Sequence, residues 1–313
     1  MKKRLLILAG LLAILMVGCS NEKQEEKSNS CGEISNDEAS SDELEPEVAV
    51  EKVCAYKIIN TVYNSEDVLE RKFETEYDSD DNILKETKFH ADGNKAQYIV
   101  YEYNKQDKLI RDTMYTSDGS EVMAANTHTY NEQGDEILNI SKRIDELTVE
   151  KYEYVYDDSN TIVNVTMHKD DEFSYELRYT YDEKGNVLEQ GYYDEKGEYN
   201  GGYEYTYDEK GNMIKEKYNS ESSNFEVIRT YDDKGNLIEQ KTFAKGHKDA
   251  SLWYKYEYDS NGNKIKSSSL ESDGSINGYD IYKYDEKGRE IECTSYYNGK
   301  LDYRRVQEYV EVK

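Results

Sequence analysis

Apolar and polar residues alternate along much of this chain, and tyrosine fills most of the apolar positions. Residues 152–156, 203–207 and 254–258 place a tyrosine at every second position, with mostly Glu or Thr between. A period of two is typical of a β-strand with one covered and one solvated face. The pattern therefore predicts strands. The single proline, Pro46, lies outside the alternating region, where it would remove no donor from a sheet.

The alternation belongs to a repeat in which each copy starts at a tyrosine followed by Asp or Asn. Successive anchor tyrosines lie 24 to 27 residues apart. They are Tyr77, Tyr103, Tyr130, Tyr156, Tyr181, Tyr207, Tyr231, Tyr258 and Tyr284, with a truncated tenth copy at Tyr309. Self-similarity at such a period indicates a repeat array rather than a globular enzyme.

A short turn follows every anchor. The fourth residue after the anchor is always Gly, Asn or Asp, which tolerate positive φ. With Asp or Asn opening the turn, this predicts a hairpin loop of type I with a bulge. A second turn is predicted in the middle of the repeat, at residues 92–94, 118–120, 196–197, 273–275 and 298–299. The seventh residue after each anchor is aliphatic, which predicts a covered position.

Each repeat is therefore two strands and two turns, which gives roughly 18–20 strands in one antiparallel meander. The predicted fold class is all-β, an elongated antiparallel β-hairpin repeat array with about two strands per 26-residue repeat. A sheet of this length must twist, coil or spiral. Its stability would be distributed over many cross-strand pairs rather than concentrated in one core. The pattern leaves open whether the sheet closes.

The repeat resembles the YD repeat of the Rhs family. The copy from Tyr181, which reads Tyr-Asp-Glu-Lys-Gly-Asn-Val-Leu and later Tyr-Glu-Tyr-Thr-Tyr-Asp, carries the likeness most closely. The resemblance covers about residues 63–313. It implies a spiralling β-sheet and an envelope or extracellular setting. It does not imply toxin activity, because the copies are too few to enclose a cargo domain and no toxin segment is recognisable.

The N-terminus has the features of an exported lipoprotein. Lys2, Lys3 and Arg4 precede the apolar run 5–17, which is too short to span a bilayer but suits a secretory signal. The run ends before Gly18-Cys19, which resembles the bacterial lipobox, so we expect Cys19 to carry lipid. The predicted domains are a signal peptide at 1–18, a lipidated cysteine and flexible acidic tether at 19–50, and the repeat domain at 51–313.

Composition narrows the class of partner. The chain has a formal net charge of -27 and 34% charged residues, which argues against DNA, RNA or anionic lipid as a partner of a basic patch. Low aliphatic content at this charge is typical of disorder. The 32 tyrosines at fixed spacing argue instead for a folded repeat domain.

Catalytic and metal-binding motifs are not recognisable in the sequence. The histidines His90, His128, His168 and His247 fall in different repeats and are expected to be solvated strand or loop residues. Acidic turns such as 78–82 resemble calcium loops only weakly, and turn chemistry explains them. Cys31 and Cys54 could pair, while Cys293 is expected to be a lone thiol in a strand. No cofactor and no enzymatic activity is predicted.

The expected function is that of a cell-envelope lipoprotein, anchored by Cys19 and facing outside the cytoplasm. It would serve as a non-catalytic binding or adhesion scaffold for a polysaccharide, glycoprotein or surface protein. Tyrosine rings could stack on sugars, or they could simply cover the sheet. The candidate binding surface comprises Tyr152, Tyr154, Tyr179, Tyr203, Tyr205, Tyr254 and Tyr256. The alternative is a passive spacer or an accessory component of a surface or toxin-related system.

Overall fold

The computed structural model describes residues 48–312, which form β-strands joined by short turns. The strands are β1 (Tyr56–Asn64), β2 (Leu69–Tyr77), β3 (Ile83–Phe89), β4 (Lys95–Tyr103), β5 (Leu109–Thr116), β6 (Val122–Tyr130), β7 (Glu136–Arg143), β8 (Glu146–Tyr156), β9 (Ile162–Lys169), β10 (Glu172–Tyr181), β11 (Val187–Tyr193), β12 (Tyr199–Tyr207), β13 (Met213–Ser220), β14 (Asn224–Tyr231), β15 (Leu237–Ala244), β16 (Leu252–Tyr258), β17 (Lys264–Leu270), β18 (Ile276–Tyr284), β19 (Glu290–Tyr297) and β20 (Lys300–Glu311). The all-β prediction, with two strands per repeat, is confirmed.

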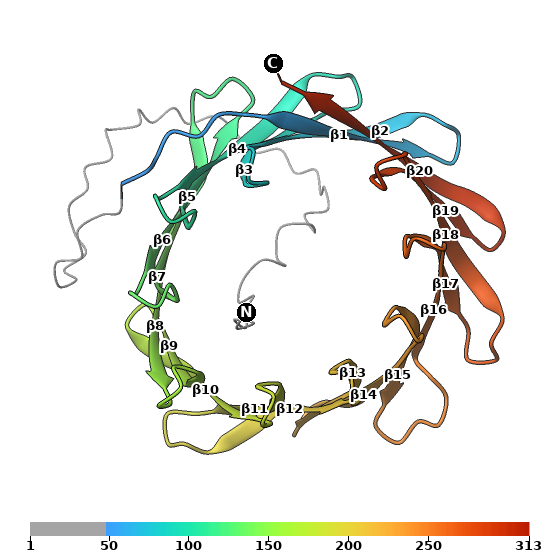
Figure 1. The fold of residues 1–313 in the computed structure, drawn as a ribbon. Helices are drawn as coiled ribbons and strands as arrows, with labels where there is room; N and C mark the ends of the chain where they lie inside the picture. The colour runs from blue at the N-terminus through green and yellow to red at the C-terminus, as the bar shows by residue number, and fades with distance from the viewer. Residues whose placement is uncertain (1–47, 313) are drawn as a thin grey trace. The chain divides into compact units, whose positions relative to one another are not determined.

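All the strands belong to a single antiparallel sheet, which closes on itself. Each strand pairs with the next along the chain, so that the strands follow one another around the sheet in chain order (Figure 1). The last strand, β20, then pairs with β1, with Tyr56 opposite Glu311 and Asn64 opposite Tyr303. Closure leaves β1 and β20 without an unpaired edge, which is the part of a sheet most prone to aggregation.

The anchor turns have the predicted hairpin geometry. In the copy at Tyr181, the Asp182 amide donates to the Asn186 carbonyl at 2.9 Å and the Gly185 amide donates to the Asp182 carbonyl at 3.0 Å. The fourth residue after each anchor has positive φ in all nine copies, from 57° at Asp107 to 89° at Gly235. The predicted mid-repeat turns also contain positive-φ residues, for example Gly93 at 85° and Gly274 at 86°.

The two faces of the sheet differ in burial. We call the face that carries the anchors and the residues two and four positions before them the tyrosine face, and the other the opposite face. Most buried apolar side chains lie on the tyrosine face, including Val165, Met167, Leu177 and Tyr179 at 3 to 7% exposure. Side chains crowd on the concave side of a curved sheet, so we infer that the sheet curves toward the tyrosine face. No large side chain in residues 48–312 falls below 2% exposure, so stability is distributed along the array.

One prediction about burial is wrong. The aliphatic residue seven positions after the anchor is not uniformly covered, because Leu188 and Ile265 are 38% and 37% exposed, although Ile110 is only 6% exposed. The ladder shifts register here: Tyr181 lies opposite Val187 while Thr180 lies opposite Glu189. Leu188 is therefore the extra residue of a β-bulge and does not follow the alternation.

The chain before β1 forms a strap, residues 48–55, over the anchor ends of the first strands. The Val50 amide donates to the Tyr103 carbonyl at 2.8 Å, and the Ala55 amide donates to the Tyr77 carbonyl at 2.7 Å. Lys52 lies 2.6 Å from Asp78 and 2.7 Å from Asp107. Val50 falls within the range predicted to be tether, and it already contacts the sheet.

Candidate functional site

The anchor tyrosines join each repeat to the one before it. The Tyr207 hydroxyl donates to the Val187 carbonyl at 2.8 Å, and the Tyr258 hydroxyl donates to the Leu237 carbonyl at 2.8 Å. The acceptor is in each case the sixth residue after the preceding anchor. The same bond is made by Tyr103, Tyr130, Tyr181, Tyr231, Tyr284 and Tyr309. The anchor hydroxyls therefore stabilise the sheet by hydrogen-bonding one repeat to the next.

The candidate binding tyrosines all lie on the tyrosine face, in β8, β10, β12 and β16. Tyr179 is buried at 7% exposure, and the Tyr154 hydroxyl donates to the Glu136 carbonyl at 2.7 Å. The Tyr152 hydroxyl donates to Glu150 at 2.8 Å. Burial raises the pKa values of Tyr152, Tyr154, Tyr179, Tyr203, Tyr205 and Tyr256 above that of a free phenol. Tyr152, Tyr154 and Tyr179, in β8 and β10, therefore contribute to the packing of the sheet itself.

A cluster of aromatic rings remains half-buried on β12, β13 and β14. The Tyr203 ring lies 4.8 Å from the Tyr218 ring and 6.0 Å from the Tyr205 ring, centroid to centroid. The Phe225 ring lies 5.4 Å from that of Tyr218. We call Tyr203, Tyr205, Tyr218 and Phe225 the aromatic cluster. It brings together two of the predicted binding residues, Tyr203 and Tyr205, with two that the sequence did not single out.

In β6 a histidine takes the place of a tyrosine. His128 stands two residues before its anchor, with Nδ1 2.7 Å from Glu136 and Nε2 3.2 Å from Asp112. Its side chain is 13% exposed, so the expectation that it is solvated is wrong. Burial alone would lower the pKa of His128, but Asp112 and Glu136 outweigh it and raise that pKa to about 9.

The other histidines differ from one another. His90 and His247 are exposed loop residues, as expected. His168 is half-buried in β9 and packs edge-on against Phe173 at 6.0 Å between centroids, so the expectation of a solvated residue is wrong there too. Within residues 48–312 no group of three or more His, Cys, Asp or Glu side chains is arranged to hold a metal ion.

The Asp78 carboxylate shows why the acidic turns have this composition. It accepts hydrogen bonds from the backbone amides of Asp80 at 2.9 Å and Asn82 at 2.8 Å, and from the Asn82 side chain and Lys52. Burial would raise the pKa of Asp78, but the bonds from Lys52 and Asn82 outweigh it and lower that pKa to about 2. Turn chemistry therefore accounts for this carboxylate, as predicted.

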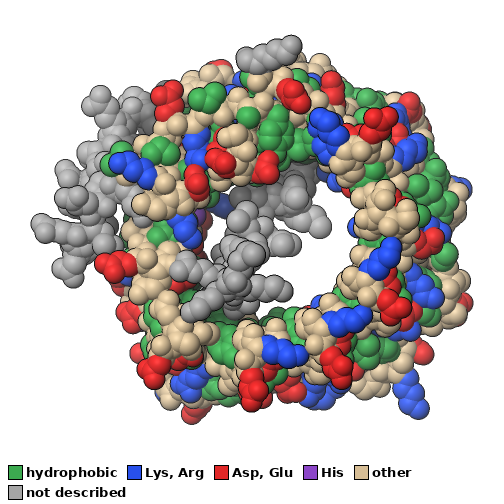
Figure 2. All heavy atoms as spheres, viewed as in Figure 1, with side chains coloured by type: hydrophobic (Ala, Val, Ile, Leu, Met, Phe, Trp, Pro, Cys, Tyr) green, Lys and Arg blue, Asp and Glu red, His purple; other side chains and the backbone are tan. Residues whose placement is uncertain are grey.

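The opposite face is a solvated surface of cross-strand ion pairs. Lys57 lies 2.8 Å from Glu74, Lys283 lies 2.6 Å from Glu292, and similar pairs join other neighbouring strands. Side chains of both signs are also interleaved at the end of the closed sheet that Figure 2 shows. Exposed pairs of this kind contribute little stability individually, about 0–1 kcal/mol. They maintain solubility and favour one strand register.

Cations also stack on the aromatic rings of the opposite face. The Lys241 amine lies 4.2 Å from the centre of the Trp253 ring, and the Arg178 guanidinium lies 3.9 Å from that of Tyr193. These contacts concentrate near the mid-repeat turns. The sequence pattern did not single out either ring, because both fall outside the tyrosine-face alternation.

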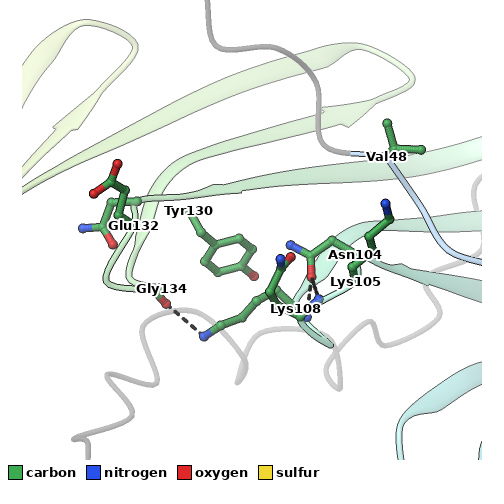
Figure 3. Close-up of a pocket in the computed structure, with 9 residues that line it drawn as sticks. Val48, Asn104, Lys105, Lys108, Tyr130, Glu132 and Gly134 are labelled. Carbon is green, nitrogen blue, oxygen red and sulfur yellow. Dashed lines mark hydrogen bonds between the residues drawn. The ribbon is translucent and has the colours of Figure 1, made fainter.

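An opening of about 480 Å³ lies between two consecutive anchor turns (Figure 3). It is lined by Val48, Asn104, Lys105, Gln106, Lys108, Tyr130, Asn131, Glu132 and Gly134. The Lys108 amine donates to the Gly134 carbonyl at 2.9 Å and stands 5.3 Å from the centre of the Tyr130 ring. The lysine thus ties one turn to the next, and we assign no chemistry to this opening.

The cysteines divide between described and undescribed parts of the chain. Cys293 is a buried free thiol in β19, as predicted, and burial raises its pKa to about 11. Cys54 is also free, and its thiol donates to the Tyr56 carbonyl at 3.5 Å. Cys19 and Cys31 lie outside the described residues, as does the predicted signal peptide. Residues 48–312 contain no long apolar helix of the kind that crosses a bilayer.

This chain matches one family model over a short segment and resembles solved structures only at low similarity. A family model described as "Protein of unknown function (DUF2963)" matches residues 63–113, which include the first two anchors. No curated protein matches the chain. The crystal structure of TcdB2-TccC3-Cdc42 is 13% identical over 78% of this chain and 14% of that chain, with a TM-score of 0.42. A porin-like protein from Bacteroides uniformis ATCC 8492 is 9% identical over 86% of this chain and all of that chain, with a TM-score of 0.36.

This chain thus spans about a seventh of the TcdB2-TccC3-Cdc42 chain that it matches. Similarity at these TM-scores carries no functional conclusion, and the resemblance to the YD repeat stays a prediction. Function must be inferred from the residues themselves.

Proposed function

We propose that this protein is a lipid-anchored protein of the cell envelope whose closed repeat sheet is a non-catalytic binding scaffold. Its partner would be a polysaccharide or a surface protein. The export signal and Cys19 support the location, and the net charge of -27 argues against nucleic acid as the partner.

The observation that supports binding most directly is the aromatic cluster. Tyr203, Tyr205, Tyr218 and Phe225 are half-buried, and each ring is held by at least one other ring at 4.8 to 6.4 Å. Rings fixed before binding lose little conformational entropy when a partner arrives. An aromatic face of this kind can stack on a sugar ring or receive an apolar side chain.

A passive spacer is the second candidate. The hydrogen bonds from the anchor hydroxyls to the preceding repeat favour it, because these tyrosines already have a structural role. A spacer would need the closed sheet and no exposed recognition surface. The two functions differ in what they require of Tyr203 and Tyr205, whose rings lie beside the anchor Tyr207 without making its carbonyl bond.

The test uses the full chain, displayed on cells and solubilised in mild detergent. We expect saturable binding to isolated envelope polysaccharides or to a surface protein, and Tyr203→Ser with Tyr205→Ser should weaken it by about tenfold or more. Tyr101→Ser with Tyr282→Ser, each two residues before its anchor and outside both the candidate binding surface and the aromatic cluster, is the matched control for folding. Binding that survives the first double variant would favour the spacer.

The anchor is tested separately. Cys19→Ala should move the protein from the membrane fraction to the soluble exported fraction, because two acyl chains anchor stably and their loss leaves no other predicted anchor. Retention of Cys19→Ala in the membrane fraction would contradict the lipoprotein assignment without bearing on the binding scaffold.

A further inference from the structure

Two glycines lie directly opposite each other on neighbouring central strands of the opposite face. Gly191 in β11 pairs with Gly202 in β12, and the row extends to Arg178 in β10 and Asn219 in β13. We call Arg178, Gly191, Gly202 and Asn219 the glycine row. Glycine within a strand costs about 0.5–1 kcal/mol relative to alanine, so two in register call for a reason.

Close approach to the backbone is that reason. A Cβ on Gly202 would lie 2.3 Å from the Gln190 carbonyl oxygen and 3.0 Å from the Tyr199 hydroxyl oxygen. A Cβ on Gly191 would lie 2.7 Å from the Tyr193 ring. Because both glycines lack a side chain, the Tyr193 ring can pack over Gly191 and the Tyr199 hydroxyl can lie over Gly202.

Tyr193 and Tyr199 have different surroundings. Tyr193 is held by the Arg178 guanidinium at 3.9 Å, and Arg178 is itself fixed by Glu176 through bonds of 2.7 and 3.3 Å. Tyr199 meets Tyr193 edge-on at 5.6 Å, and 56% of it is exposed. Tyr199 is thus a positioned ring that presents most of its surface to solvent.

Carboxylates flank the other side of the glycine row. Glu189 lies directly opposite Glu204, and both are exposed. Like charges directly opposite each other destabilise an antiparallel pair. Asn219 and Lys217 offset this partly, because the Asn219 amide donates to Glu204 at 3.0 Å and Lys217 lies 3.4 Å from it. The juxtaposition of Glu189 and Glu204 itself costs stability, yet it sets two strong acceptors beside an exposed ring.

This arrangement selects among partners. An added peptide strand is excluded here because β10, β11, β12 and β13 are each paired on both sides. A polyanion would meet the paired carboxylates and a chain of net charge -27. A neutral sugar suits both halves of the site, since its C–H face can stack on the ring and its hydroxyls can donate to carboxylates.

We propose that Tyr199, with Glu189 and Glu204 across the glycine row, binds a neutral glycan. This deepens the proposed function, on which it rests, by naming the partner class and a second surface. The site lies on the opposite face, whereas the aromatic cluster lies on the tyrosine face, although both use β12. Because the two sets of side chains point to different faces, a variant of one leaves the ring contacts of the other in place.

The experiment measures binding of the full chain, in mild detergent, to immobilised neutral hexasaccharides of β-1,4-linked glucose and of β-1,4-linked N-acetylglucosamine. We expect Tyr199→Ser to weaken binding by about tenfold or more and Tyr199→Phe to retain most of it, because phenylalanine keeps the ring. Tyr297→Ser is the matched control. Tyr297 has a similar exposure, 58%, and also lies beside a glycine, Gly278, but it belongs to a distant hairpin. This variant should leave binding unchanged.

A second variant separates recognition from folding. Glu189→Gln should weaken glycan binding while the midpoint of thermal unfolding stays the same or rises, because it removes a like-charge repulsion. A purely structural role predicts no loss of binding in this variant. Glycan binding that survives both Tyr199→Ser and Glu189→Gln would overturn the site and leave the scaffold function standing. Failure of the wild-type chain to bind either glycan would overturn the site as well, and a saturable protein partner would then preserve the scaffold function alone.

Discussion

Strands β6 and β12 occupy equivalent places in their repeats and differ in what fills the tyrosine face. In β12, Tyr203 and Tyr205 precede the anchor Tyr207, and the Tyr203 and Tyr205 rings stack with centroids 6.0 Å apart. In β6, Asn126 and His128 precede the anchor Tyr130. The anchor itself behaves identically, since Tyr130 donates to the Leu109 carbonyl at 2.7 Å and Tyr207 to the Val187 carbonyl at 2.8 Å.

This difference shows which positions of the repeat must hold a particular residue for the sheet to form. The anchor and its turn set the backbone, whereas the positions two and four residues before the anchor accept either rings or charge. Charge there needs compensation from neighbouring strands: His128 takes Asp112 from β5 and Glu136 from β7, and Arg229 of β14 takes Glu216 from β13 at 2.7 Å. A tyrosine ring carries no charge to compensate, and Tyr203 and Tyr205 pack on each other.

The largest effect is expected from removing the charge in β6. His128→Leu would leave Asp112 and Glu136 partly buried without their cation, which should lower the free energy of unfolding by about 3–4 kcal/mol. Urea unfolding followed by circular dichroism measures it. Tyr205→Leu, at the equivalent position of β12, is the control and should cost less. Equal losses in the two variants would show that the histidine acts only by filling space.

The pH dependence of unfolding gives a sharper form of the same comparison. The pKa of His128 is raised from 6.5 to about 9, so the folded state favours the protonated ring. Its contribution is fully present below pH 6.5 and is lost as the pH rises through about 9, by about 3 kcal/mol in total. Urea midpoints of the wild type should therefore fall across this window relative to those of His128→Leu. Parallel midpoints in the two proteins would contradict the ion-pair assignment.

The smallest effect concerns what β6 and β12 share. Tyr207→Phe removes the hydroxyl that donates to the Val187 carbonyl and should destabilise the fold by about 1 kcal/mol. Tyr130→Phe removes the corresponding bond to Leu109 and should cost about the same, because the anchors are equivalent. Hydrogen exchange of the adjoining strands measures both. A large difference between these two variants would show that the anchors depend on their neighbours.

The local features of the fold were predictable from sequence because they depend on nearby residues. The positive φ at Asp81, Asn160 and Gly235 follows from the residue type at the fourth position. Tyrosine alternation located the covered face for the same reason. The exposure of Leu188 was not predictable from a binary pattern, because a bulge places an extra residue where alternation assumes none.

Neither the closure of the sheet nor the ion pairs of His128 could be predicted from the repeat pattern, because each depends on which strands become neighbours in the fold. The pairing of β1 with β20 joins residues at the two ends of the array, which no pattern within a single repeat encodes. For His128 a signal existed: an acidic residue nine positions after one anchor faces the residue two positions before the next. Asp112 with His128 and Glu216 with Arg229 both follow this rule, as does Glu86 with the Tyr101 hydroxyl. Recognising it requires the strand register.

The strap and the closing strand pair have a mechanical consequence. Tension applied to the chain before Val48 would reach the Lys52 ion pairs and then β1, which is hydrogen-bonded to β2 on one side and to β20 on the other. Detaching β1 requires two ladders to break together, whereas the end strand of an open array peels away from one neighbour. A tethered molecule built in this way would resist pulling at the point where the force enters.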